Sequence, residues 1–184
     1  TQLTASSVTA TYNVAKKLVV TLKDSNGVLA NKKVTVKVGK ISKTLKTNSK
    51  GQVSVDISSL APKAYTASIK FAGDANYSAS SKSVKVTVKK ATPKLTAKAK
   101  SFKKSVKTKK YSVTLKTNKN KAIKKAKVTL KVKGKTYAAK TNSKGKATFK
   151  ITKLTKKGTY KAVIKYKGNK YYKKATKKVK IKIK

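Results

Sequence analysis

The chain has 184 residues and a formal net charge of +48 at pH 7, because it contains 51 lysines and only three acidic residues, all of them aspartate. Cysteine and histidine are absent, which excludes disulfides and thiolate or imidazole metal sites and removes the usual general base at neutral pH. We therefore expect neither a cofactor nor enzyme activity. No apolar run approaches the roughly 20 residues that span a bilayer, so we expect no membrane insertion.

Strands are predicted from residue 18 onward, where apolar and polar residues begin to alternate with the period of two that is typical of half-buried β-strands. Turn sequences separate the runs, among them "DSNG" (24–27) and the loop "AGDANYSASS" (72–81). The segment "ISKTLKT" (41–47) lacks this phase and predicts a variable edge strand, where lysines hinder aggregation between strands. The residues expected to point inward are Leu18, Val20, Leu22, Val34, Val36, Val38, Val53, Val55, Ile57, Tyr65, Ala67, Ile69, Phe71, Val84, Val86 and Val88.

The pentapeptide "TNSKG" occurs at residues 47–51 and again at residues 141–145. Its flanks also match: "KKVTVKV" (32–38) aligns with "AKVTLKV" (126–132), and the strand that follows each copy is similar. The chain is therefore a tandem duplication, with domains at residues 1–90 and 91–184. We expect Gly51 and Gly145 to adopt positive φ and close a tight hairpin, with the asparagine side chain bonding the local backbone.

The second copy keeps the apolar phase of the first. Its expected inward residues are Tyr111, Val113, Leu115, Val128, Leu130, Val132, Ala147, Phe149, Ile151, Tyr160, Ala162, Ile164, Tyr166, Val179, Ile181 and Ile183. Short strands at regular spacing, with no helical periodicity, predict an all-β fold of two tandem immunoglobulin-like antiparallel β-sandwiches.

The run "FAGDANYSASSKSVKVTV" (71–88), preceded by "TNSKGQVSVDI", resembles the bacterial immunoglobulin-like repeats of large surface adhesins and of adhesin-like proteins of methanogenic archaea. The second copy keeps the frame as "YKGNKYY" (166–172), with Asn169 in place of Asp74. "LTKKGTY" (154–160) looks like the tyrosine corner of immunoglobulin-like sandwiches. The resemblance implies extracellular, load-bearing modules at the cell surface or in the cell wall.

The two repeats differ in charge. Residues 1–90 contain 16 lysines and three aspartates, for +13, whereas residues 91–184 contain 35 lysines and no acidic residue, for +35. Outward positions are expected to change from threonine and serine to lysine between the copies. The candidate polyanion-binding residues are Lys127, Lys131, Lys161, Lys165, Lys180 and Lys182.

These charges predict that the second repeat binds an anionic cell-wall polymer or surface glycan, as part of a non-catalytic stalk or anchor. Nucleic acid is the alternative partner, because lysine contacts to phosphate give salt-dependent binding that ignores base sequence. Specific readout prefers arginine and stacking aromatics; arginine is absent, and the adjacent Tyr171 and Tyr172 are the pair from which one ring could be exposed. Because the chain begins at Thr1 without methionine, we expect it to be part of a longer protein. We also expect this part to be a monomer.

Two other chemistries concern the aspartates and the asparagines near them. Asp24, Asn26, Asp74 and Asn76 offer oxygen ligands for calcium, but calcium takes six to eight oxygens, so a turn-forming role is the favoured interpretation. A Lys–Asn isopeptide bond, as in some surface adhesins, needs a buried acid, and Asp24, Asp56 and Asp74 are the only acids that could supply it.

Overall fold

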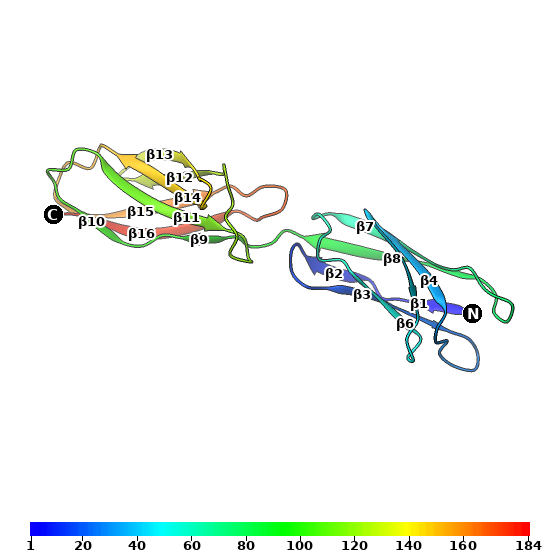
Figure 1. Ribbon diagram of the computed structural model, residues 1–184. Helices are drawn as coiled ribbons and strands as arrows, with labels where there is room; N and C mark the ends of the chain where they lie inside the picture. The colour runs from blue at the N-terminus through cyan, green and yellow to red at the C-terminus, as the bar shows by residue number, and fades with distance from the viewer. The chain divides into compact units, whose positions relative to one another are not determined.

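The computed structural model describes residues 1–184, and all of its regular secondary structure is β-strand. The chain divides into two compact units, Thr1–Lys90 and Ala91–Lys184. Each unit is a sandwich of a three-stranded and a five-stranded sheet (Figure 1). The two units are therefore immunoglobulin-like β-sandwiches, in the fold class that the alternation predicted. No helix of the length and apolarity needed to cross a bilayer is present.

In the first unit, the three-stranded sheet has the order β1-β3-β6, and the five-stranded sheet has the order β2-β8-β7-β4-β5. The bounds of these strands are β1 (Gln2–Thr4), β2 (Val8–Thr11), β3 (Lys17–Lys23), β4 (Lys33–Val38), β5 (Ile41–Lys46), β6 (Gln52–Asp56), β7 (Ala64–Phe71) and β8 (Ser80–Lys89).

The second unit repeats this topology strand for strand, as β9-β11-β14 and β10-β16-β15-β12-β13. The bounds are β9 (Lys94–Thr96), β10 (Lys100–Phe102), β11 (Lys109–Lys116), β12 (Lys127–Val132), β13 (Lys135–Lys140), β14 (Lys146–Ile151), β15 (Gly158–Tyr166) and β16 (Ala175–Ile183). The segment without clear phase, β5, lies at the edge of its sheet as predicted.

One pairing in each unit departs from the antiparallel expectation. The short strands β2 and β10 pair in parallel with the last strands, β8 and β16. Each follows a strand, β1 or β9, that belongs to the opposite sheet. The first segment of a unit thus changes sheets partway along, and its second half meets the last strand running in the same direction. The short strands of these first segments have too few residues for their alternation to be recognised in the sequence.

The predicted inward phase forms the two cores. All of the predicted inward residues are buried except Tyr65, Tyr160 and Val179, which are half-buried. The outward neighbours within the same strands are half-buried or exposed. Burial of β-branched and aromatic side chains from both sheets is therefore the main stabilising contribution in each unit.

The pentapeptide "TNSKG" joins strands of different sheets, so the predicted hairpin is wrong. It connects β5 to β6 and β13 to β14, and neither pair of strands is hydrogen-bonded. Gly51 and Gly145 do adopt positive φ, of 68° and 74°. A Cβ on either glycine would lie 2.7 or 2.5 Å from a backbone oxygen, that of Leu22 or Leu115. Only glycine fits this corner.

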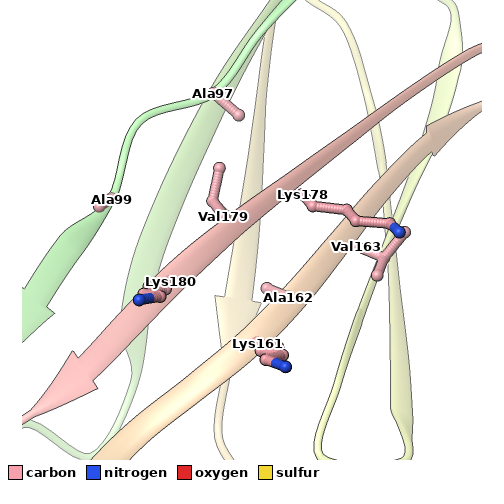
Figure 2. Close-up of a pocket in the computed structure, with 8 residues that line it drawn as sticks. All are labelled: Ala97, Ala99, Lys161, Ala162, Val163, Lys178, Val179 and Lys180. Carbon is pink, nitrogen blue, oxygen red and sulfur yellow. The ribbon is translucent and has the colours of Figure 1, made fainter.

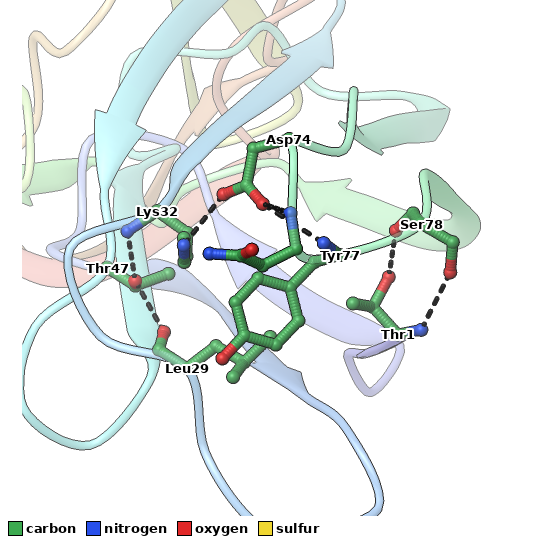
Figure 3. A network of polar contacts seen from close by, with 8 residues as sticks. Thr1, Leu29, Lys32, Thr47, Asp74, Tyr77 and Ser78 are labelled. Carbon is green, nitrogen blue, oxygen red and sulfur yellow. Dashed lines mark hydrogen bonds and ion pairs between the residues drawn. The ribbon is translucent and has the colours of Figure 1, made fainter.

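The threonine and asparagine of the pentapeptide hold the corner through hydrogen bonds. The buried Thr47 hydroxyl donates to the Leu29 carbonyl at 2.6 Å and accepts from the Lys32 amide at 2.9 Å (Figure 3). Thr141 makes the matching bonds with Ile123 and Ala126. The side-chain oxygens of Asn48 and Asn142 each accept two backbone N–H bonds, as expected for local turn chemistry. The sequence repeats here because the same corner is built twice.

The predicted tyrosine corner is also confirmed. Tyr160 donates its hydroxyl to the carbonyl of Lys156 at 2.8 Å, four residues upstream. Tyr65 makes the same bond to Ala61 at 2.7 Å in the first unit. These hydroxyls stay near the surface, which explains why both rings are only half-buried.

Neighbouring residues of β14 test the strand phase. Phe149 is fully buried, so Phe149→Ala should lower the free energy of unfolding by about 3–5 kcal/mol, as large-to-small core substitutions do. Lys150 is exposed, so Lys150→Ala should change it by no more than about 0.5 kcal/mol. Chemical denaturation of each variant measures both values. A larger loss of stability for Lys150→Ala than for Phe149→Ala would contradict the predicted inward and outward positions on β14.

Tyr166 offers a stabilising substitution. Its hydroxyl is buried without a hydrogen-bond partner, and burial raises its pKa. The matching residue in the first unit is Phe71, which has the same ring without the hydroxyl. Tyr166→Phe should therefore raise the free energy of unfolding by about 1 kcal/mol, because an unsatisfied buried polar group is removed. Phe71→Tyr is the reciprocal control and should lower the stability of the first unit.

Candidate polyanion-binding surface

The structure brings all six candidate lysines together on the outer surface of one sheet. They lie on β12, β15 and β16, which are adjacent strands of the five-stranded sheet of the second unit. All six are exposed, and each alternates with a core residue on its strand. Because successive side chains of a strand point to opposite faces of the sheet, the lysines lie on the outer face and the core residues on the inner face of the same strands.

Two further lysines, which the sequence analysis missed, belong to the same surface. Lys140 on β13 is directly opposite Lys127, and Lys178 on β16 is directly opposite Val163. Lys178 shares the alternation of Lys180 and Lys182, and that signal was present in the sequence. Lys140 lies on the edge strand β13, whose sequence does not alternate clearly, so only its pairing with Lys127 shows that it belongs to this surface. We call the set the lysine face: Lys127, Lys131, Lys140, Lys161, Lys165, Lys178, Lys180 and Lys182.

The expected change from threonine and serine to lysine is wrong at four of the six candidates. When the five-stranded sheets of the two units are aligned residue by residue, the first unit already has lysines at these four positions. They are Lys33, Lys37, Lys70 and Lys85, which match Lys127, Lys131, Lys165 and Lys180. Only Lys161 and Lys182 replace threonines, Thr66 and Thr87. Among the missed residues, Lys178 replaces Ser83 and Lys140 matches Lys46.

The three-stranded sheet of the second unit shows a larger change. Its outward lysines are Lys94, Lys110, Lys116, Lys146 and Lys150. At the same positions the first unit has Gln2, Lys17, Lys23, Gln52 and Asp56. Both outer surfaces of the second unit are thus positive and contain no acidic side chain.

The strand register turns this charge into direct repulsion. Side chains directly opposite each other on neighbouring antiparallel strands have Cβ atoms about 4.5–5.5 Å apart, and like charges at such positions are destabilising. The first unit has one such lysine pair, Lys33–Lys46. The second unit has four: Lys94–Lys116, Lys110–Lys150, Lys127–Lys140 and Lys161–Lys180.

Three of these four pairs arise from a single replacement each. The clearest is Lys110–Lys150, because the matching pair in the first unit, Lys17–Asp56, has opposite charges. A hydrogen bond from the Ser58 backbone, with a smaller contribution from Lys17, lowers the pKa of Asp56. Replacing this aspartate by lysine converts an attraction on the sheet surface into a repulsion.

The side-chain ion pair of the chain also lies in the first unit. Lys32 Nζ is 2.7 Å from Asp74 Oδ2 and lies 4.4 Å from the centre of the Tyr77 ring (Figure 3). The hydrogen bond from Lys32 is the main cause that lowers the pKa of Asp74. The second unit has Ala126 and Asn169 at the positions of Lys32 and Asp74, so both partners are replaced together.

The aspartates serve the turns in which they lie. Oδ1 of Asp24 and of Asp74 each accepts two backbone N–H bonds within its own loop, and Asp56 accepts one from Ser58. None of the three is buried, which contradicts the isopeptide alternative because that reaction needs a buried acid. No group of three or more His, Cys, Asp or Glu side chains gathers in the structure. The turn-forming interpretation therefore accounts for these residues.

Of the adjacent pair Tyr171 and Tyr172, one ring is partly exposed, in line with the expectation. Tyr172 is buried, whereas Tyr171 is half-buried and has Lys170 Nζ at 4.9 Å from its ring centre. The second unit therefore presents lysines outward and keeps most of its aromatic surface inward.

The fold and the surface define a class: tandem immunoglobulin-like sandwiches, the second of which is densely cationic. No protein-family model matches the chain, and no curated protein matches its sequence. Among solved structures, invasin, a bacterial integrin-binding protein, shares its fold, with a TM-score of 0.58 at 17% identity. The alignment covers 100% of this chain and 39% of invasin.

Two further solved structures align at lower similarity. A Ca²⁺-stabilised adhesin with which an Antarctic bacterium binds ice gives a TM-score of 0.39 at 14% identity, over 100% of this chain and 49% of that one. The titin domains Z1Z2, in complex with telethonin, give 0.47 at 10% identity, over 98% and 93%. The chain thus spans less than half the length of the two bacterial proteins.

Restoring the aspartate of the first unit tests the repulsion on the second sheet surface. Lys150→Asp should raise the melting temperature of the second unit at low ionic strength, because the new carboxylate lies opposite Lys110. Added salt should shrink the gain, since surface charges are screened. Lys150→Ser is the matched control that removes the charge without adding an opposite one. Scanning calorimetry checks the order, and a Lys150→Asp variant no more stable than Lys150→Ser would contradict it.

Proposed function

We propose that this chain is a non-catalytic stalk and anchor of a cell-surface protein, in which the second unit holds the chain against an anionic cell-wall polymer or surface glycan. The observation that carries the proposal is the contrast between the two units. They share a core, a corner and a strand order, yet one direct lysine pair in the first unit becomes four in the second. The fold tolerates this repulsion, and a polyanion would relieve it.

The binding mechanism follows from Coulomb's law and counterion release. An anionic polymer repeats its charges along a line, and the lysine face offers rows of cations along β12, β15 and β16. Each contact releases condensed counterions, so the affinity should fall steeply as salt rises. Because no single lysine is singled out, neutralising several should weaken binding by degrees.

The observations favour a wall polymer or glycan over nucleic acid. The chain has no arginine for bidentate contacts to bases, and of the two tyrosines considered for stacking Tyr172 is buried while Tyr171 is half-buried beside Lys170. The likeness of fold to invasin is compatible with a surface-exposed stalk, as is the tandem repeat of two sandwiches. An extracellular position, in the cell wall or on the cell surface, is part of the proposal, as is a monomeric state within a longer chain.

The two units supply a matched experiment within one intact chain. In one variant, Lys127, Lys131, Lys140, Lys165 and Lys180 are changed to glutamine; in the other, the five matching residues Lys33, Lys37, Lys46, Lys70 and Lys85 are changed. Both variants lose the same number of charges from the same surface of the same fold. Binding to isolated anionic wall polymer should fall far more in the first variant, and the slope of log K against log salt should become shallower.

Three ligands and a salt series separate the alternatives. The chain should bind wall polymer and a sulfated glycan with similar salt dependence, because diffuse charge recognises charge density. A strong preference for DNA that persists at physiological salt would favour nucleic-acid binding instead. Equal losses in the two glutamine variants would contradict the assignment of binding to the second unit.

A further inference from the structure

A groove lies beside the lysine face where the sheet is incomplete. Strand β10 pairs with β16 only at residues 181–183, so the earlier part of β16 has no strand on that side. The connection between β9 and β10 runs past it while crossing from one sheet to the other. Between this connection and strands β15 and β16 is an open groove of about 670 Å³ (Figure 2), within the range of small-ligand sites.

The groove has an apolar wall and a cationic rim. Ala97 and Ala99 line it from the connection, and Val163 and Val179 line it from the sheet. Figure 2 shows the Ala97 side chain directed toward Val179 across the groove. Because both connecting residues are alanines, their side chains leave the space open. The rim consists of Lys161, Lys178 and Lys180, all members of the lysine face.

The first unit has a smaller pocket on the matching part of its sheet, without this rim. It has a volume of about 330 Å³ and is lined by Thr66, Ser83 and Lys85 where the second unit has Lys161, Lys178 and Lys180, but no residue of the connection between β1 and β2 lines it. One cation therefore becomes three. On the lysine face, the second unit gains only three lysines over the first. Two of them, Lys161 and Lys178, are at this rim, and the third is Lys182 in place of Thr87.

The rim cations lie close enough together to repel each other. Lys161 and Lys180 are directly opposite on β15 and β16, and Lys178 is on the same surface of β16, two residues away. No acidic side chain exists in this unit to separate them. An anionic group bound between them would replace repulsion by charge-assisted hydrogen bonds, which are the stronger kind.

We propose that this groove binds an acidic sugar residue of the anionic polymer, with the C–H face of the ring on Ala97, Ala99 and Val179 and its carboxylate or phosphate among Lys161, Lys178 and Lys180. The proposal rests on the proposed function and gives it a defined subsite. A sugar ring fits both halves of the lining, because it has an apolar C–H face and anionic substituents at its edge. The groove is open to solvent along the lysine face, so a residue inside a long chain can enter without a free end.

The test uses the intact chain and short probes: a uronic-acid trisaccharide, a sugar-phosphate oligomer of equal length, and a neutral trisaccharide. Lys161→Thr/Lys178→Ser installs the residues of the first unit in the groove. Lys33→Gln/Lys46→Gln removes the same number of charges from a directly opposed lysine pair of the first unit, outside the lysine face and away from the groove. Ala97→Leu fills the groove without changing any charge.

Titration calorimetry should show that the groove pair and Ala97→Leu each weaken binding of an acidic trisaccharide at least about tenfold, as expected for lost charge-assisted contacts or a blocked site. The Lys33/Lys46 control should change it by less than about twofold. Ala97→Leu should leave low-salt binding of the long polymer nearly unchanged, since that binding depends on diffuse charge. Calorimetric melting of each variant verifies that it is folded, and the surface lysine pair tests the groove even if Ala97→Leu does not fold.

The outcomes separate the two proposals. If the long polymer binds but neither acidic oligomer does, or if the groove variants bind them like the unaltered chain, the groove subsite is overturned while the anchor function stands. Equal binding of the neutral trisaccharide would also overturn it, because the lysine rim would then have no role. Failure of the long polymer to bind the unaltered chain would overturn the anchor function itself.

Discussion

Burial of apolar rows from two facing sheets is the interaction on which both units depend. The second unit has 35 lysines and no acidic side chain, so ion pairs between its side chains cannot offset its self-repulsion. Its core, by contrast, keeps Val, Leu, Ile, Phe and Tyr at the positions occupied by apolar residues in the first unit. The strand period of two makes this possible, because it places a charge and a core residue on opposite surfaces of the same strand.

The comparison of the units separates what the fold requires from what it permits. Asn169 replaces Asp74 yet still accepts the two backbone N–H bonds that shape the loop. The ion pair that Asp74 makes with Lys32 is lost, together with its lysine, which is Ala126 in the second unit. The loop thus needs a side-chain oxygen at this point and does not need its charge. The corner residues Thr141, Asn142 and Gly145 are unchanged from the first unit, because the corner depends on the hydrogen bonds of the first two and on the positive φ of the glycine.

The lysines of the second unit include some that the first unit also has and some that only the second unit has. Most of the lysine face already exists in the first unit, so the face alone does not distinguish the two domains. On the sheet surfaces, the differences include the three-stranded sheet, where Asp56 becomes Lys150, and the groove, where Thr66 and Ser83 become Lys161 and Lys178. A uniform drift toward lysine would spread its replacements over the five-stranded surface, whereas two of the three added lysines there line one concave site and the third, Lys182, lies two residues beyond Lys180 on β16. This concentration is the reason to distinguish a defined subsite from a diffuse anchor.

The sequence by itself determined the duplication, the inward phase of the long strands, the positive-φ glycines and the tyrosine corner. These features depend on a local period or on hydrogen bonds between residues close in the chain, which a sequence displays directly. Only the tertiary structure decided that "TNSKG" joins two sheets, that β10 runs parallel to β16, and that Lys161 lies opposite Lys180. Strand neighbours and register are set by contacts between distant segments, and a period of two is the same for any pairing. For that reason the alternation placed the lysines of the lysine face outside, while the pairing alone decided which lysines meet and where a groove remains beside them.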